Sequence, residues 1–311
     1  MDRPNLILNA RAPRVSSFRQ TVRRLRLRGQ AALLRRAYEY SFWRRYRGVE
    51  TFELTVEGRT VVFSTRDERA KRFFFPRYAG GKLHEGTLTQ ALLGRLRGAG
   101  CFMDVGACVG YYSCLAAAFL PQGRVVAFEM DERNYAILRE NLFRNGFDNV
   151  EAVHTAVSEG SGSVRYDPRT RFTDFAILPP GEPGNGTVGR SVRSISLDDY
   201  VKQTGQIPDV VKIDVEGAEQ QVLRGMRWLI QEHAPLLFIE VHERKLRRLG
   251  ASPQDVVSQL LGYGCRVWEV PEFKRSAEAS FRLLSSPADI DPSRVSLLYV
   301  EPGVPAKRQG A

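Results

Sequence analysis

A regular alternation of short apolar runs with helical segments, beginning near residue 100, restricts the fold more than any other feature. Runs and helices that alternate in this way are typical of consecutive β-α-β units. Such units build a parallel sheet with helices on both faces, so the sequence predicts a doubly wound α/β fold. The expected strands are Cys101–Val105, Arg124–Glu129, Val150–Thr155, Val210–Asp214, Leu236–Val241, Cys265–Val270 and Val295–Val300.

Turn and cap residues divide this pattern. Ser196 and Ser252 each begin a capping box, in which an aspartate three residues later replaces the usual Glu or Gln. Residues 167–190 are rich in Pro-Gly turn signals, which predicts a long loop. A long loop inside a compact sheet is usually functional or disordered.

The segments before residue 100 have a different character. Thr51–Val56 and Thr60–Thr65 alternate apolar and polar residues around a Glu-Gly turn, which predicts a β-hairpin. An irregular stretch and then a helix over Thr87–Leu96 follow. We therefore expect a basic tail with an amphipathic helix over 1–48, a hairpin and helix extension over 49–98, the α/β domain over 99–302, and a disordered tail over 303–311.

The net charge of +11 resides in the N-terminal segment. Residues 1–48 hold 13 Arg and two acidic residues, and the rest of the chain balances its charges. From Ser17 to Arg47 the apolar residues fall near one helical stripe that includes Leu33, Ala37 and Tyr40. Two interpretations stay open: a helix packed on the protein with solvated arginines, or an interfacial helix over 17–47 on an anionic membrane or acidic polymer.

Composition also bears on the compartment. No apolar run approaches the roughly 18 residues that span a bilayer, and the N-terminus lacks the apolar block of a secretory signal. Cys101, Cys108, Cys114 and Cys265 lack metal-ligand spacing, which favours free thiols in a reducing compartment. We expect a cytoplasmic protein, with peripheral contact at the inner membrane face as the alternative that the arginines leave open.

A glycine-rich turn follows the first strand of the sheet, where doubly wound folds bind ligands. Gly106 and Gly110 allow a tight turn and a close approach to a ligand, and Asp104 precedes them. The spacing is not that of a dinucleotide loop, and Asp104 would repel a pyrophosphate. The same carboxylate favours the cationic sulfonium and ammonium of S-adenosylmethionine. On this interpretation Gly106→Val blocks cofactor binding sterically.

Glu129 ends the second strand, 25 residues after Asp104. A carboxylate at that strand end can accept both ribose hydroxyls of an adenosyl group, and hydrogen bonds to a charged acceptor contribute about 1.5–3 kcal/mol each. Glu129 is therefore the predicted ribose ligand.

Ionisable residues also follow the fourth and fifth strands: Lys212, Asp214 and Glu216 after one, Glu240 and His242 after the other. Adjacent strand ends in this topology face the space beside the ligand, which allows these side chains to converge. A histidine with an ordinary pKa near 6.5 suits removal of a hydroxyl proton near neutral pH.

Other readings of these residues stay open. Lys212 can pair with a neighbouring acid, and Asp214 with Glu216 can hold a divalent metal through oxygen ligands. Glu219 is expected on a solvated helix face.

Taken together, these strings resemble the FkbM family of S-adenosylmethionine-dependent methyltransferases, over residues 82–245. The Lys-Ile-Asp-Val-Glu-Gly string is the most distinctive part, and Cys108-Val109 departs mildly from the family pattern. The matching segments are His84–Thr87, Met103–Tyr112, Val126–Glu129, Ala156–Ser158, Ser194–Tyr200, Asp209–Glu219 and Pro235–His242.

The resemblance implies O-methylation of a hydroxyl on a sugar, glycan or polyketide-like acceptor, and a seven-stranded sheet with an antiparallel last strand. Val295–Val300 is the candidate for that strand, and the adenine is expected near Ala156. The expected cofactor-binding residues are Glu85, Asp104, Gly106, Ala107, Gly110, Glu129, Ala156 and Asp214. The expected catalytic residues are Lys212, Asp214, Glu216 and His242.

Two other function classes remain as hypotheses. A nucleic-acid methyltransferase would use the arginine-rich segment as a phosphate clamp. Against it, the fourth strand ends in Ile213-Asp-Val-Glu-Gly217 and not in the Pro-Pro-aromatic string of amino-methylating enzymes. A catalytically idle binding or membrane-scaffold module is the other hypothesis, and a dehydrogenase is disfavoured by the glycine spacing.

Overall fold

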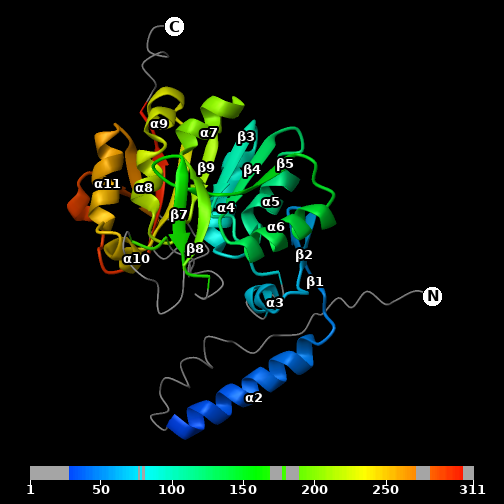
Figure 1. Cartoon of the computed structure of the whole chain (residues 1–311). Helices are drawn as coiled ribbons and strands as arrows, with labels where there is room; N and C mark the ends of the chain where they lie inside the picture. Colours follow the sequence, from blue (N-terminus) through cyan, green and yellow to red (C-terminus); the bar gives the residue numbers. More distant parts are fainter. Residues whose placement is uncertain are drawn as a thin grey trace. The chain divides into compact units, whose positions relative to one another are not determined.

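The computed structural model describes residues 28–75, 78, 81–168, 177–179, 189–270 and 281–303. They belong to two compact units, one up to His84 and one from Glu85 onward. Figure 1 labels the elements in chain order.

The first unit is built on aromatic packing between a hairpin and two helices. Its elements are α2 (Arg28–Tyr46), β1 (Thr51–Val56), β2 (Arg59–Ser64) and α3 (Glu68–Phe74). The hairpin is confirmed, and Glu57 and Gly58 both have positive φ, as the twist of a tight hairpin favours. The Phe74 ring stacks on Phe63 and Phe52, with ring centroids 4.7 and 5.0 Å apart. Because a two-stranded hairpin is marginal by itself, α3 supplies the apolar cover that stabilises it.

Helix α2 joins this unit through its C-terminal half. Phe42 and Tyr46 are buried, and the Tyr46 ring stacks on Phe75 with centroids 4.4 Å apart. Arg72 of α3 donates two hydrogen bonds to the Glu39 carboxylate, at 3.0 and 2.6 Å.

The apolar stripe of α2 differs from the predicted one. Leu33 and Tyr40 are 66% and 71% exposed. The buried side is set by Phe42 and Tyr46, because these large rings bury the most apolar area against α3. Residues 17–27, the first part of the predicted helix, lie outside the described residues.

The second unit is an α/β structure around one eight-stranded sheet. The strand order is β12-β11-β13-β10-β9-β3-β4-β5, and β13 is antiparallel to both of its neighbours. The doubly wound prediction with an antiparallel last strand is confirmed, and the eighth strand is the short β12. The bounds are β3 (Cys101–Val105), β4 (Arg124–Glu129), β5 (Val150–His154), β9 (Val210–Ile213), β10 (Leu236–Val241), β11 (Arg266–Val270), β12 (Arg282–Leu284) and β13 (Ser296–Glu301).

The strand order reverses between β3 and β9. From β3 the chain proceeds outward through β4 and β5, and after β9 it proceeds the other way through β10. In open α/β sheets the carboxyl ends of the strands on either side of such a reversal form the ligand-binding crevice. The fold therefore directs attention to the residues that end β3, β4, β9 and β10.

Helices cover the sheet and bury its central strands. One apolar cluster joins Val105, Val211 and Ile239 of the sheet to α7–α11, and Figure 1 shows α8, α9 and α11 standing together beside the strands. The helices of this unit are α4 (Gly86–Leu96), α5 (Tyr111–Phe119), α6 (Glu132–Arg144), α7 (Leu197–Thr204), α8 (Glu219–Arg224), α9 (Arg227–His233), α10 (Glu243–Arg248) and α11 (Pro253–Gly262), with a 3-10 turn, η1 (Pro287–Asp289).

A smaller sheet, in the order β6-β8-β7, holds the residues that follow β5. Its strands are β6 (Ala156–Val157), β7 (Gly162–Tyr166) and β8 (Arg190–Ile195). The predicted loop at 167–190 lies mostly outside the described residues, apart from 167–168, 177–179 and 189–190.

The two predicted helix caps differ in the structure. The Ser252 capping box is complete, with both reciprocal hydrogen bonds present. Ser196 accepts the backbone N–H of Asp199, but the Asp199 carboxylate accepts a hydrogen bond from Ser161.

Two expectations about the whole chain hold for the part that the structure describes. The four cysteines are free thiols. None of the described helices combines the length and the apolar character that a membrane span requires.

Asp198 provides a test of how α7 and α9 are joined. Its carboxylate accepts the backbone N–H groups of Trp228 and Leu229 at 3.0 and 2.9 Å, in the first turn of α9. Because Asp198→Ala leaves both donors without this acceptor, we expect the free energy of unfolding to fall by about 1–3 kcal/mol. Urea denaturation measures the loss, and Asp148→Ala on the exposed surface serves as the control. An equal effect of the two substitutions would contradict this assignment.

Candidate active site

The glycine turn after β3 is held by backbone contacts on both sides. The N–H groups of Gly106 and Ala107 donate to the Phe128 carbonyl of β4, at 3.0 and 2.9 Å. Gly106 has φ +84°, and a Cβ placed on it would lie 2.0 Å from the carbonyl oxygen of Asp214. The turn therefore lies directly against the chain that leaves β9.

Gly110 is also constrained, at the start of α5. It has φ +81°, and a Cβ there would lie 2.5 Å from Leu138 Cδ1 of α6. Gly106 is required by its close approach to the Asp214 backbone, and Gly110 mainly by its positive φ, because the Leu138 side chain can move. In Gly106→Val the added side chain therefore meets the Asp214 backbone. This clash arises within the protein, whether or not a ligand is bound.

Glu129 is oriented by two backbone donors at the end of β4. The N–H groups of Cys108 and Asp131 each donate to one of its carboxylate oxygens, both at 2.7 Å. The side chain is buried, and burial raises its pKa to about 8 although the two N–H donors act to lower it. Each carboxylate oxygen offers about two lone pairs, so both oxygens retain one for a further donor.

A buried ion-pair group connects β3 and β9. Asp104 and Lys212 are register partners on these strands, and their Oδ1 and Nζ atoms lie 3.9 Å apart. Ser113 of α5 donates to the other Asp104 oxygen at 2.6 Å, and Lys212 Nζ donates to Asp214 Oδ2 at 3.4 Å. Asp104 thus has its charge opposed inside the protein.

Lys212 also faces the aromatic ring of Tyr112, with Nζ 4.8 Å from the ring centroid. The Tyr112 hydroxyl donates to Glu85 Oε2 at 3.0 Å. Burial alone would lower the pKa of Lys212, but the charges of Asp214, Asp104 and Glu85 outweigh it and raise the pKa above its ordinary value. Lys212 is therefore a charged structural cation, and its pairing with neighbouring acids is confirmed.

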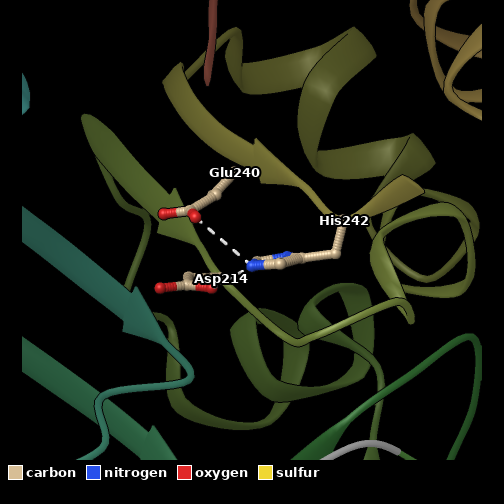
Figure 2. Close-up of side chains that lie close together, drawn as sticks. All are labelled: Asp214, Glu240 and His242. Atoms are coloured by element: carbon tan, nitrogen blue, oxygen red, sulfur yellow. Dashed lines mark ion pairs between the residues drawn. The ribbon is translucent and has the colours of Figure 1, made fainter. Parts of the chain in front are cut away.

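The imidazole of His242, just after β10, is surrounded by carboxylates. Nδ1 lies 3.0 Å from Glu219 Oε1, and Nε2 lies 3.3 Å from Glu240 Oε1 and 3.7 Å from Asp214 Oδ1. Glu216 Oε2 is 3.2 Å from Nε2 and also accepts a hydrogen bond from Lys245. Figure 2 shows the ring directed toward Asp214 and Glu240, which come from adjacent strand ends.

The electrostatics of this cluster differ from those of an ordinary histidine base. Burial would lower the pKa of His242, but hydrogen bonds to Glu219 and Glu240 and the charge of Glu216 raise it well above its usual value. An imidazole in this setting holds a proton at neutral pH, so by itself it is a weak base. Asp214 Oδ1 is a buried atom without a hydrogen-bond partner among the described residues, which makes it the more available acceptor.

The structure corrects one prediction and adds residues that the sequence did not indicate. Glu219 was expected on a solvated face, but its side chain is fully buried and binds both His242 and the N–H of Gly217. Ser113 and Lys245 were not predicted at all. Their contacts depend on helices packing onto strand ends, for which the sequence carries no local pattern.

The remaining predicted residues lie near this edge without a polar side-chain role. Ala107 is buried in the glycine turn, and Ala156 is buried in β6. The backbone N–H of Thr155 donates to the Glu129 carbonyl at 3.1 Å, which places the chain before Ala156 beside β4.

Comparison with known proteins adds the family. The family model "Methyltransferase FkbM domain" matches residues 104–267, which is more than half of the chain. The chain belongs to the FkbM methyltransferase family. The matched range begins at Asp104 and includes the glycine turn, Glu129 and the His242 cluster.

Two curated relatives and one solved structure are also similar to this chain. Hexuronic acid methyltransferase AglP of Haloferax volcanii is 30% identical over 160 residues, which are 50% of this chain and 59% of the relative. Methyltransferase sdnD of Sordaria araneosa is 24% identical over 163 residues, 40% of this chain and 59% of the relative. A crystal structure of methyltransferase FkbM from Methylobacillus flagellatus is 20% identical, with TM-score 0.41, covering 65% of this chain and 43% of that one. The chain spans about 59% of the length of both curated relatives.

Gly106 gives a direct test of the close approach between the two loops of this FkbM domain. In Gly106→Ala the new Cβ meets the Asp214 carbonyl and a positive φ is imposed on alanine, so we expect the free energy of unfolding to fall by about 2–4 kcal/mol.

The matched control for this test is Gly205→Ala. Gly205 has φ +69° but open space where its Cβ would lie. We therefore expect the free energy of unfolding to fall only by the cost of a positive φ on alanine, about 1 kcal/mol. Equal losses in the two variants, measured by urea denaturation, would show that the loops are not in contact.

Proposed function

We propose that this protein is an S-adenosylmethionine-dependent O-methyltransferase that acts on a hydroxyl group of a sugar, glycan or polyketide-like acceptor. The observation that carries the proposal is the contact between the Gly106 turn and the Asp214 backbone. It brings a loop suited to a nucleoside cofactor against a residue of the His242 cluster, so cofactor and acceptor would share one crevice.

The residues at the ends of β3 and β4 fit the cofactor. Glu129 retains one acceptor position on each oxygen, which matches the two hydroxyls of a ribose. We assign the ribose to Glu129, the adenine to the segment around Ala156, and the amino-acid part to the chain beside the Gly106 turn. S-adenosylmethionine supplies the methyl group on a sulfonium.

The acceptor would lie beside Asp214 and His242. Asp214 Oδ1 accepts the hydroxyl proton in this proposal, because it is buried and has no hydrogen-bond partner in the described part of the chain. His242 carries positive charge that stabilises the carboxylates around it. Holding the hydroxyl oxygen in line with the methyl group supplies most of the acceleration, since a positioned reaction avoids the entropy of a bimolecular encounter.

The acceptor class comes from the relatives. AglP of Haloferax volcanii is a hexuronic acid methyltransferase by its name. A polyhydroxylated acceptor also suits a sheet edge where carboxylates gather, because sugar hydroxyls donate hydrogen bonds to such oxygens.

Calorimetry with S-adenosylhomocysteine tests the cofactor assignment. We expect the compound to bind the wild-type chain and NADH not to bind, with the affinity reduced at least tenfold in Glu129→Ala because the acceptor of the ribose hydroxyls is lost. The affinity should rise with pH up to about 8 and then level off. The direction of this pH dependence follows from the raised pKa of Glu129. Below about pH 8 the carboxyl group holds a proton, and the proton occupies one of the positions that would accept a ribose hydroxyl.

The control for this titration is Glu129→Gln, whose amide does not titrate. Its affinity should lack the pH dependence attributed to Glu129. Absence of S-adenosylhomocysteine binding by folded wild-type protein would remove the enzyme proposal, and a pH dependence unchanged in Glu129→Gln would remove the role of this carboxyl.

His242→Ala tests the acceptor side separately. We expect turnover on a sugar or uronic acid panel, measured by transfer of labelled methyl, to fall about 10²-fold or more, because the group that organises the cluster is lost. The affinity for S-adenosylhomocysteine should stay at the wild-type value. Unchanged turnover would show that the cluster organised by His242 takes no part in the reaction.

A further inference from the structure

Four carboxylates gather around the His242 imidazole, at the edge where β9 and β10 end. Asp214, Glu216, Glu219 and Glu240 all lie within 3.7 Å of the imidazole. Asp104 adds a fifth carboxylate on the far side of Lys212. The ammonium groups of Lys212 and Lys245 also contact acids of this group. Carboxylates this close repel one another, and a divalent cation held between them would relieve that repulsion.

The orientation of His242 indicates where such a cation would lie. Glu219 is fully buried, and its Oε1 accepts the N–H of Gly217 at 3.0 Å, which fixes the carboxylate. A carboxylate only accepts hydrogen bonds, so Nδ1 carries a ring hydrogen directed at Glu219, 3.0 Å away. The second proton of the charged ring is on Nε2, 3.3 Å from Glu240 Oε1, and it is the proton that a bound metal ion would displace. Histidines that bind metals are commonly oriented in this way, with the second ring nitrogen presented to the ion.

The Glu240 oxygen and Nε2 have the spacing of two ligands to one ion, and Asp214 Oδ1 lies slightly farther away. Donors about 2.1 Å from a metal and about 90–110° apart lie about 3.0–3.4 Å from each other. Nε2 lies 3.3 Å from Glu240 Oε1 and 3.7 Å from Asp214 Oδ1, and one donor atom from each of the three side chains lies within 4.8 Å of the others. Figure 2 shows the two carboxylates and the ring converging on one point.

The neighbours separate ligands from supporting groups. Lys212 binds Asp214 Oδ2 and leaves Oδ1 as a buried atom without a hydrogen-bond partner in the described part of the chain. Lys245 binds Glu216, which makes that carboxylate a poorer ligand. Asp214 Oδ1, Glu240 Oε1 and His242 Nε2 are therefore the three donor atoms.

We propose that Asp214, Glu240 and His242 bind a divalent metal ion, and that its open coordination positions take two neighbouring oxygens of the acceptor. One nitrogen and two oxygen donors suit a first-row ion such as Mn²⁺. The inference rests on the proposed function only for the acceptor. With the ion bound, Asp214 Oδ1 would be its ligand and not the proton acceptor; a metal-bound hydroxyl is more acidic and would lose its proton to water. The inference narrows the acceptor to a molecule with adjacent hydroxyls, or with a hydroxyl beside a carboxylate, because such a pair chelates an ion that a lone hydroxyl holds weakly.

Binding of Mn²⁺ alone to the metal-stripped full chain tests the site. Free Mn²⁺ gives an electron paramagnetic resonance signal that disappears on binding, and we expect saturation at one ion per chain. Asp214→Asn and His242→Gln should each weaken binding at least tenfold. Glu219→Gln should weaken it by about 10–100-fold through loss of ring orientation, although this residue does not touch the ion.

Glu243→Gln is the matched control, since this carboxylate adjoins His242 in sequence but pairs with Arg247. It should bind Mn²⁺ as the wild type does. No depletion of free Mn²⁺ by folded wild-type chain, or equal weakening in Glu243→Gln and His242→Gln, would overturn the proposal. The wild-type titration by itself tests whether the chain binds Mn²⁺, even where a variant does not fold.

The same samples separate this proposal from the proposed function. S-adenosylhomocysteine binding without Mn²⁺ binding would remove the metal site and leave the methyltransferase. Mn²⁺ binding without S-adenosylhomocysteine binding would leave the metal site and remove the methyltransferase proposal. Under the proposal, a diol acceptor should protect bound Mn²⁺ from chelation better than its mono-hydroxyl analogue, and equal protection would remove the acceptor role.

Discussion

The buried ammonium group of Lys212 is the interaction on which the geometry of the site depends. Burying one charge alone costs several kcal/mol, so Lys212 can be accommodated in the sheet only together with its acids. Asp104 lies beside it in register on β3, and Asp214 follows it on the same strand. The group thereby joins the two strands at the point where the sheet reverses direction. The glycine turn and the Asp214 loop meet there.

The carboxylates at this edge differ in what their partners leave for a ligand. Asp104 accepts a hydrogen bond from Ser113, and its charge is opposed by Lys212 at 3.9 Å, so it supports the loop. Glu129 is held by backbone N–H groups and keeps acceptor positions for hydroxyls. Asp214 has one oxygen on Lys212 and one directed at His242. Under the proposed function, these surroundings make Asp104 a support for the loop, Glu129 a ligand of the cofactor and Asp214 a group that serves the acceptor.

Much of this was predictable because it depends on local pattern. The apolar runs indicated seven of the eight strands of the main sheet, and the strand ends indicated Glu129, Lys212 and His242. The short strand β12 and helix α3 were missed, since three and seven residues carry too little periodicity. Glu219 was misassigned for another reason. Its charge is typical of a solvated helix, and only the packing of α8 beside His242 makes its burial favourable.

The sequence by itself determined the doubly wound fold, the family resemblance and the residues at the ends of the strands, because these follow from hydrophobic alternation and from motifs contiguous in the chain. Only the tertiary structure decided how those residues combine. It brought Gly106 against Asp214, and it paired Lys212 with Asp104. It also surrounded His242 with carboxylates from separate segments. These contacts set burial and charge balance, and both depend on distances in space that spacing along the chain does not specify.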